Sequence, residues 1–224
     1  DKGLFEQAMD MMVSRGPDDQ GVCYSPKAGL ALGHRRLSIL DLSTVGHQPM
    51  ISNDGRFTVI FNGEIYNFQE IVESLSGRYQ FKTKTDTEVL LAAYDEWGTE
   101  CLKYLRGMFA FAIWDEQKKS LFVVRDRLGI KPLYYSVIGN SFYFASEIKA
   151  ILKLSGIKRE LNKQGYLDYL NYRQVLGQHT FFKGIDSLLP GHYLLLGEGK
   201  KVEQIKYWDL PVLDKKNDPG EKQI

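Results

Sequence analysis

The chain has 224 residues, a formal net charge of +1 and 12% aromatic residues, which suits one domain around a large core. Lys and Arg are interspersed with Asp and Glu, which argues against a nucleic-acid partner, because phosphate binding needs clustered positive charge. The longest wholly apolar run, Met108 to Trp114, is far shorter than a membrane span, and the N-terminus lacks the apolar core of a signal peptide. We therefore expect a cytoplasmic protein without nucleic-acid or membrane partners, and the sequence leaves a homodimer open.

Two elements are predicted near the N-terminus. Apolar residues recur with a helical period from Leu4 to Val13, and the turn Arg15-Gly16-Pro17 ends this helix. The segment LALGHRRLSILDL, residues 30–42, has aliphatic residues on both sides of a His-Arg-Arg cluster. This pattern predicts a largely buried strand around Arg36.

The remaining strands are short and joined by local turns, which favours antiparallel sheets. The turn at 53–55 leads into a strand over Phe57–Phe61, which we expect to end at Asn62. Met108–Trp114 has no polar face and should be covered on both sides, so the core should be layered. Hairpins are predicted between 108–114 and 121–124, between 133–137 and 142–145, and between 193–196 and 202–207.

Helices interrupt this series of strands. Capping patterns predict one helix from Asn67 to about Ser76 and another from Asp86 to Trp97, stopped by Gly98. The capping pairs are Asn67 with Glu70 and Thr85 with Glu88. A shorter helix should follow Ser146, and the charged segment from Leu213 to Ile224 is typical of a linker.

The two cysteines, Cys23 and Cys101, have neither the number nor the spacing of a disulfide framework or a metal site. We interpret both as reduced core thiols, and we predict no metal site.

Asn62-Gly63 allows two interpretations. Asn-Gly is the best two-residue hairpin turn, but too few residues separate it from Asn67 for a returning strand. The alternative is a pair of hydrogen-bond donors, an amide side chain beside the N–H of a residue without a Cβ. Such a pair has the makeup of an oxyanion hole.

Arg36 and Asp86 are also ambiguous when taken singly. A buried Arg usually forms a structural ion pair, and an acid in the first turn of a helix is favoured by the helix dipole. Taken together with Asn62-Gly63, they supply a guanidinium for a carboxylate, an acid for an ammonium and donors for a carbonyl. An amino-acid amide needs these three kinds of partner.

Eight motifs, in order, resemble the glutaminase domain of glutamine-dependent asparagine synthetases, which are class II, N-terminal-nucleophile glutamine amidotransferases. The motif HRRLSILDLS is similar to the synthetase branch of that class. The motifs are SRGPDD (14–19), HRRLSILDLS (34–43), GHQPM (46–50), FNGEIYN (61–67), TDTE (85–88), GMFAFAIWD (107–115), RDRLGIKPLYY (125–135) and SEIKA (146–150).

The resemblance implies an α+β fold, a four-layer αββα sandwich of two antiparallel sheets. It also implies that an N-terminal cysteine attacks the side-chain amide of glutamine, with its own α-amine as general base. By match to the motifs, Arg36 binds the α-carboxylate of glutamine, Asp86 binds its α-ammonium, and Asn62 with Gly63 stabilises the oxyanion. Glu64 matches a residue that lines the glutamine pocket, although a solvated loop acid is an equally good interpretation.

The chain departs from the family at its start. The nucleophile belongs in a Cys-Gly-Ile-like strand ahead of the Leu4–Val13 helix, whereas this chain starts at Asp1, and Ser14 stands where the family usually has His. Neither Cys23 nor Cys101 has a free α-amine. We expect the chain as it stands to be unable to hydrolyse glutamine, either because the leading strand is missing from an active amidotransferase or because a scaffold or glutamine-binding domain has lost its nucleophile.

The acceptor half of the reaction has no counterpart in these residues. No Ser-Gly-Gly-x-Asp-Ser-like pyrophosphate loop occurs, so we expect no cofactor in this domain. We expect residues 1–212 to form the glutaminase domain and 213–224 to lead to a C-terminal synthetase domain that uses ATP and Mg²⁺. Aspartate is the leading acceptor, but nothing in these residues excludes another carboxylate.

Overall fold

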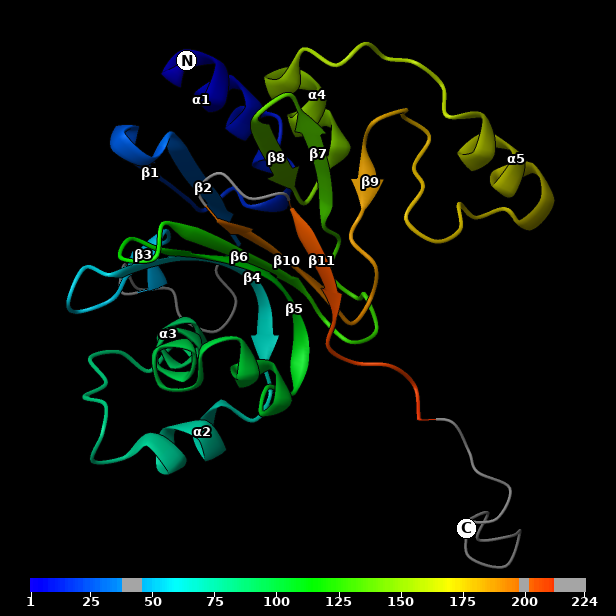
Figure 1. Cartoon of the computed structure of the whole chain (residues 1–224). Helices are drawn as coiled ribbons and strands as arrows, with labels where there is room; N and C mark the ends of the chain where they lie inside the picture. Colours follow the sequence, from blue (N-terminus) through cyan, green and yellow to red (C-terminus); the bar gives the residue numbers. More distant parts are fainter. Residues whose placement is uncertain (38–45, 198–201, 212–224) are drawn as a thin grey trace, which may run out of the picture.

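The computed structural model describes residues 1–37, 46–197 and 202–211 and has four layers (Figure 1). One outer layer holds the helices α1 (Lys2–Asp10) and α4 (Ile148–Ser155), and the other holds α2 (Phe68–Leu75) and α3 (Asp86–Trp97). Antiparallel strands form the two layers between them. The αββα sandwich that the sequence predicted is therefore confirmed.

The larger sheet has six antiparallel strands in the order β11-β10-β6-β5-β4-β3. It carries the predicted hairpins β5–β6 and β10–β11, and the predicted turn at 53–55 joins β3 to β4. The strands are β3 (Met50–Ile51), β4 (Phe57–Ile65), β5 (Gly107–Asp115), β6 (Ser120–Arg125), β10 (His192–Gly197) and β11 (Glu203–Lys206).

The second strand layer consists of two separate small sheets. One pairs β1 (Asp19–Ser25) with β2 (Leu30–Arg36), and the other has the order β8-β7-β9. Both lie between the larger sheet and the α1–α4 layer (Figure 1). The remaining elements are β7 (Tyr134–Ile138), β8 (Ser141–Ala145), β9 (Asp186–Ser187), α5 (Lys163–Tyr172) and short 3-10 turns at Val13–Arg15, Pro26–Ala28 and Gly98–Lys103.

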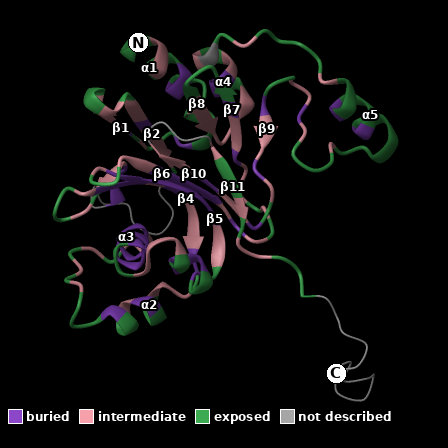
Figure 2. Cartoon of the chain, viewed as in Figure 1, coloured by how far each residue is buried: buried purple, intermediate pink, exposed green. Residues whose placement is uncertain are grey.

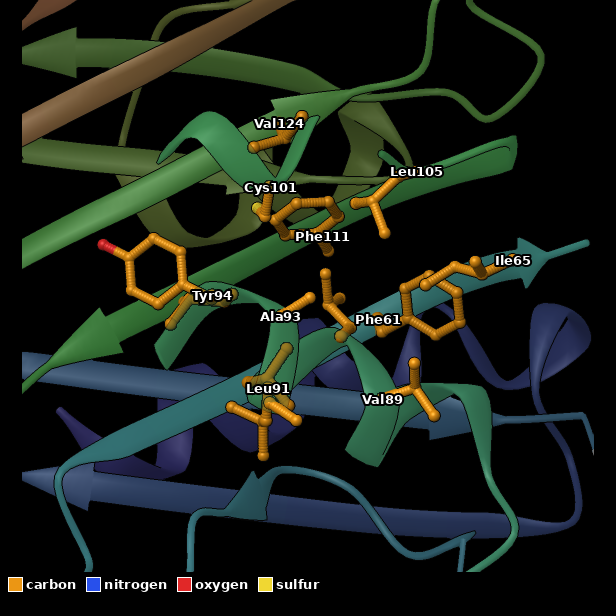
Figure 3. Close-up of a cluster of buried hydrophobic side chains, with 14 of the residues drawn as sticks. Phe61, Ile65, Val89, Leu91, Ala93, Tyr94, Cys101, Leu105, Phe111 and Val124 are labelled. Atoms are coloured by element: carbon orange, nitrogen blue, oxygen red, sulfur yellow. The ribbon is translucent and has the colours of Figure 1, made fainter. Parts of the chain in front are cut away.

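The central strand β5 faces a hydrophobic cluster on each side, as its lack of polar residues predicted. Phe109 and Phe111 point into a cluster with α2 and α3, whereas Ala110 and Ala112 belong to a cluster between the two strand layers. Figure 3 shows the first cluster, in which Phe61 and Phe111 meet side chains of α3. The small residues on the inner face allow close packing of the strand layers. Replacement of one buried Phe by Ala would lower the free energy of unfolding by about 3–5 kcal/mol.

Burial follows the same layering (Figure 2). α3 buries eight of its twelve residues under the larger sheet, and β5 and β6 are buried along most of their length. Within the described residues, no helix is both long enough and apolar enough to cross a lipid bilayer.

Several local predictions need correction. β4 does not end at Phe61 but continues to Ile65, because β5 pairs with it along its whole length. The strand around Arg36 ends at that residue, and Leu37 is exposed. Residues 38–45 of the segment predicted to be buried, and the predicted linker 213–224, lie outside the described residues.

The capping predictions were half right. Thr85 Oγ1 accepts a hydrogen bond from Glu88 N at 3.3 Å and caps α3. Asn67 precedes α2, but its amide does not cap that helix. It donates to Tyr104 O and accepts from Arg106 N, at 3.0 and 2.9 Å, and so joins α2 to a distant loop.

Candidate active site

The site residues Asn62, Gly63 and Glu64 lie near the C-terminal end of β4. They are paired with Ala110, Phe109 and Met108 of β5, respectively. An ideal Cβ on Gly63 would stand 2.1 Å from Met108 O, so any side chain here would collide with the neighbouring strand. The sequence suggested a glycine that leaves its N–H open to a ligand. The structure gives a different reason, the close approach of β5.

On the edge of β4 away from β5, the strand meets the start of α3 and the residues just before β3. Phe61 N donates to Gln48 Oε1 at 2.6 Å, and Ile65 N donates to Asp86 Oδ2 at 3.1 Å. Alternate residues of a strand direct their N–H groups to the same edge. The N–H of Gly63 therefore lies on this edge between two amides that are already bound, where it can donate to a ligand.

Asp86 is the first residue of α3, where the helix dipole favours an acid. Burial raises the pKa of its carboxyl, and the nearby charge of Glu64 raises the pKa further, while the hydrogen bond from Ile65 lowers it. The structure thus brings Asp86 and Glu64 to the same end of β4. A half-buried carboxylate in this setting can bind a cation.

Arg36 ends β2, opposite Asp19 of β1. Its guanidinium packs against the backbone of Gly46, since an ideal Cβ on that glycine would stand 2.3 Å from Arg36 Nη2. Two residues further, buried Gln48 holds both β4 and α3, because its Oε1 accepts from Phe61 N and its Nε2 donates to Thr87 Oγ1 at 3.4 Å. These contacts connect Arg36 to the β4–α3 junction through residues 46–48.

Gln48 is the part of this site that we missed. Gln48 lies in the motif GHQPM, which contributed to the family resemblance. The sequence could not show its role, because the side-chain amide joins β4 and α3, which are both distant in the sequence. A buried Gln needs hydrogen-bond partners, so the residue type was only a weak indication that this position connects other elements.

A cavity of about 140 Å³ separates the two small sheets. Its sides are β2 and β8, the helices α1 and α4 lie over it, and β4 and β5 form its floor. Neither facing strand edge has a strand partner in the cavity, since β2 pairs with β1 and β8 pairs with β7. Asn62 lines the cavity, so the cavity and the candidate site meet at this residue.

His34 lines the cavity wall. Burial lowers its pKa to about 4, although a hydrogen bond to the backbone of Phe61 raises the pKa in part. The imidazole is therefore neutral near pH 7. Its Nδ1 is buried and has no hydrogen-bond partner, which leaves a buried acceptor beside the cavity.

The two cysteines lie elsewhere. Cys101 is fully buried in the cluster under α3, as predicted, and burial raises the pKa of its thiol to about 12. Cys23 lies in β1 opposite Leu32 and is half-buried, so the prediction of a core thiol was wrong for this residue. A thiol with so high a pKa is a poor nucleophile, so Cys101 is not a candidate for the nucleophile.

Sequence comparison connects this geometry to known proteins. A family model described as a glutamine amidotransferase domain matches residues 1–208. Asparagine synthetase [glutamine-hydrolyzing] 3 of Bacillus subtilis is 38% identical over 94% of this chain and 34% of its own length. Amidase chry2 of Gibberella zeae is also 38% identical, over 94% of this chain and 31% of its own length. The chain thus spans about a third of the length of the curated relatives that it matches.

Solved structures support the fold. The glutamine phosphoribosylpyrophosphate amidotransferase from B. subtilis aligns with a TM-score of 0.55 at 19% identity, covering 80% of this chain and 35% of its own. A structure described as the allosteric regulatory enzyme of purine biosynthesis aligns with a TM-score of 0.58 at 20% identity, with the same coverage. From the family match and these relatives, the chain is a member of the glutamine amidotransferase domain family and represents that domain of the asparagine synthetase-like proteins.

Proposed function

We propose that this domain, in its native polypeptide, hydrolyses glutamine to glutamate and ammonia and supplies the ammonia to an ATP-dependent synthetase domain. The observation that carries the proposal is the edge of β4, where the Gly63 N–H lies between the bound amides of Phe61 and Ile65, beside Asn62 and Asp86. This edge offers oxyanion donors and a cation partner within a few residues of each other.

In the proposed reaction, the thiol sulfur of an N-terminal cysteine attacks the side-chain carbonyl of glutamine. The α-amine of that cysteine takes the thiol proton and passes it to the leaving nitrogen; such amines have a pKa of about 7.7–8.0. The C–N bond breaks, ammonia leaves, and water hydrolyses the thioester to glutamate. Asn62 and the Gly63 N–H stabilise the oxyanion in both steps.

Substrate recognition is assigned to three side chains. Arg36 binds the α-carboxylate of glutamine with its planar fork of donors, and Asp86 binds the α-ammonium. Burial raises the pKa of Asp86, and an arriving ammonium offsets that effect by favouring the ionised form. Glu64, beside Asp86, lines the glutamine pocket.

The cavity between β2 and β8 is the proposed place of the strand that carries the nucleophile. It has two unpaired strand edges, an apolar roof from α1 and α4, and an end at Asn62. A strand paired on both sides there would join the small sheets into one and bring its end to the oxyanion donors. The chain from Asp1 onward lacks this strand, and we propose that it is inactive for that reason.

The synthetase half remains a proposal. We assign residues 1–212 to the glutaminase domain and 213–224 to a linker toward a C-terminal domain that activates an acceptor carboxylate with ATP and Mg²⁺ in the cytoplasm. The length of the relatives supports a further domain, and their names support an asparagine-synthetase-like one. The alternative is a scaffold or glutamine-binding domain that has lost its nucleophile.

The native gene product decides between these alternatives. Intact-mass analysis shows whether its mature end is cysteine, and enzymatic assays of glutamate and ammonia show whether it hydrolyses glutamine. We expect a cysteine end and turnover in the native protein, and no turnover in the chain that starts at Asp1. A native protein that lacks this cysteine and binds glutamine without hydrolysing it would establish the scaffold.

A further inference from the structure

The helix α5 has the reverse of the usual distribution of polar and apolar side chains. Its buried residues are Gly165 and Asp168, whereas α2 buries Ile71 and Leu75. The large apolar residues of α5 are 40–65% exposed, and they are Tyr166, Leu167, Tyr169, Leu170 and Tyr172. A helix in a single-domain protein normally turns such residues inward.

Specific contacts hold α5 in this orientation. Asp168 Oδ2 accepts from Leu176 N at 3.2 Å, and its Oδ1 accepts from Gln164 Nε2 at 2.8 Å. An ideal Cβ on Gly165 would stand 2.3 Å from Thr180 O, so the helix rests on the backbone of the following segment. Tyr169 packs edge-on against Phe181, with the ring centroids 5.3 Å apart, while Tyr166, Leu167, Leu170 and Tyr172 remain 44–65% exposed.

The exposed apolar surface extends beyond the helix. Leu161 and Leu176 are also exposed, so seven of the eighteen large exposed apolar side chains of the described residues fall within 161–176. Such a concentration is unusual for a surface that faces water. We call this surface the α5 face. The same part of the chain carries five exposed basic residues, Lys158, Arg159, Lys163, Arg173 and Lys183, and one exposed acid, Glu160, which pairs with Lys183.

The α5 face belongs to a segment that returns to the place where the chain leaves the sandwich. The segment from 156 to 191 passes through α5 and β9 and ends at Gly191, whose carbonyl accepts from Tyr207 N and Trp208 N at 2.9 and 3.2 Å. In Figure 1, α5 stands apart from the four layers at the upper right, and the described chain leaves β11 toward the lower right.

We infer that the α5 face is the docking surface for the C-terminal domain of the native polypeptide. The inference rests on the proposed function for the identity of that domain. This chain covers 28–43% of the asparagine synthetase relatives, so the remaining length of such a protein is larger than this domain. Interfaces between domains of one chain bury about 600–1,500 Å². The α5 face is the segment in which exposed apolar residues are concentrated, and the exposed basic residues between 158 and 183 favour an acidic surface on the partner domain.

Hydrogen–deuterium exchange of the native-length protein, compared with residues 1–224, tests the inference. We expect peptides covering 161–176 to exchange at least about tenfold more slowly in the native-length monomer. Equal exchange in the two proteins, or a native polypeptide that has no domain after this one, would overturn the inference. This measurement needs no catalysis, so it stands even where glutamine hydrolysis fails.

Two other occupants are outcomes of the same experiment. If peptides covering 161–176 are protected in residues 1–224 alone and light scattering shows a dimer, the occupant of the α5 face is a second copy of the chain and not the C-terminal domain. Binding of residues 1–224 to phosphatidylglycerol vesicles, lost at high salt, with no protection in the native-length protein would assign the face to an anionic membrane.

A coupling assay adds a functional test. Leu167→Glu with Leu170→Glu, in the native-length protein, should lower the amide product formed per glutamine hydrolysed by at least about threefold, with glutamine hydrolysis itself unchanged. Val137→Glu is the matched control, because Val137 and Leu167 are 52% and 50% exposed. An unchanged ratio for the double variant, or an equal loss in the control, would contradict the docking role.

Discussion

The carboxylate of Asp86 accepts a hydrogen bond from the backbone N–H of Ile65, with 3.1 Å between Oδ2 and N. This bond joins the first residue of α3 to the last residue of β4. It also keeps a half-buried acid beside the strand edge on which the Gly63 N–H lies. The proposed substrate site is thus built at the same junction that connects the helix layer to the larger sheet.

Asp86→Asn should separate function from stability. Burial raises the pKa of Asp86, so the folded state binds a proton more tightly than the unfolded state, and ionisation weakens folding as pH rises above the usual carboxyl range. The Asn variant keeps an acceptor for Ile65 N and lacks this cost. Urea unfolding should therefore show that it gains stability relative to wild type from acid to neutral pH, while glutamine binding is lost. A difference between the two proteins that is the same at both pH values would contradict the burial argument.

Asn62→Ala should reduce catalysis in the native-length enzyme. Loss of one oxyanion donor costs about 2.7–4 kcal/mol of transition-state stabilisation elsewhere, a fall of about 10²–10³ in kcat. Steady-state glutamate release measures this fall. Asn140→Ala, in the exposed turn between β7 and β8, is the control and should leave kcat unchanged. Normal turnover of Asn62→Ala would remove this residue from the mechanism.

Arg36 offers a test of substrate binding. Arg36→Lys replaces a planar fork with a point charge and should raise KM more than it lowers kcat. Gly46→Ala should act in the same direction without touching substrate, because the added Cβ would stand 2.3 Å from Arg36 Nη2 and displace the flexible guanidinium. Glutamine titrations of both variants check this expectation. A Gly46→Ala enzyme with the wild-type KM would show that the position of Arg36 is unimportant.

His34 should make the domain sensitive to acid. Burial lowers its pKa from 6.5 to about 4, so the unfolded chain takes up a proton at a pH where the folded protein does not. Folding is therefore weakened as pH falls from 6.5 to about 4, by up to about 3 kcal/mol at 1.36 kcal/mol per unit of pKa. His34→Gln keeps a donor for the Phe61 backbone and does not titrate. Its unfolding free energy should fall less over this range, and identical pH profiles would contradict the argument.

Arg56 should stabilise the far end of β5. Its Nε and Nη2 donate to the two oxygens of fully buried Asp115, at 3.2 and 2.9 Å. Burial alone would raise the pKa of Asp115, but the bonds from Arg56 and Lys118 bring it below its usual value. Folding is thus supported by the ionised carboxylate and weakens as pH falls through that lowered pKa.

Arg56→Met leaves Asp115 buried without its partner and should cost about 3 kcal/mol, measured by urea unfolding. Arg78→Met is the control, because the ion pair of Arg78 with Glu96 lies at the surface and should contribute less than about 1 kcal/mol. Equal effects of the two variants would show that burial of Asp115 is not the cause.

The sequence predicted well where one segment determines its own structure. α3 has the predicted bounds, Asp86 to Trp97, because its cap, its apolar residues and Gly98 lie within fourteen consecutive positions. The hairpins are correct for the same reason. The family was also recognisable, because eight ordered motifs are specific even though each is short.

The predictions failed where contacts with residues distant in the sequence determine the local structure. The polar residues after Phe61 looked like the end of a strand, but pairing with β5 extends β4 to Ile65. Asn67 had a good capping pattern, yet its amide binds Tyr104 and Arg106. Gln48 has its partners on β4 and α3, so its role depends on contacts that local patterns do not contain.

Gly63 joins two requirements in one position. The space in which its side chain would lie is filled by the carbonyl of Met108, while its N–H lies on the edge of β4 away from β5. Directed evolution toward a different amide therefore has no freedom at residue 63, since each replacement would first separate two central strands. Asp86 and Thr87, on the helix side, are restricted as well, since Asp86 accepts from Ile65 N and Thr87 Oγ1 accepts from Gln48, which holds β4.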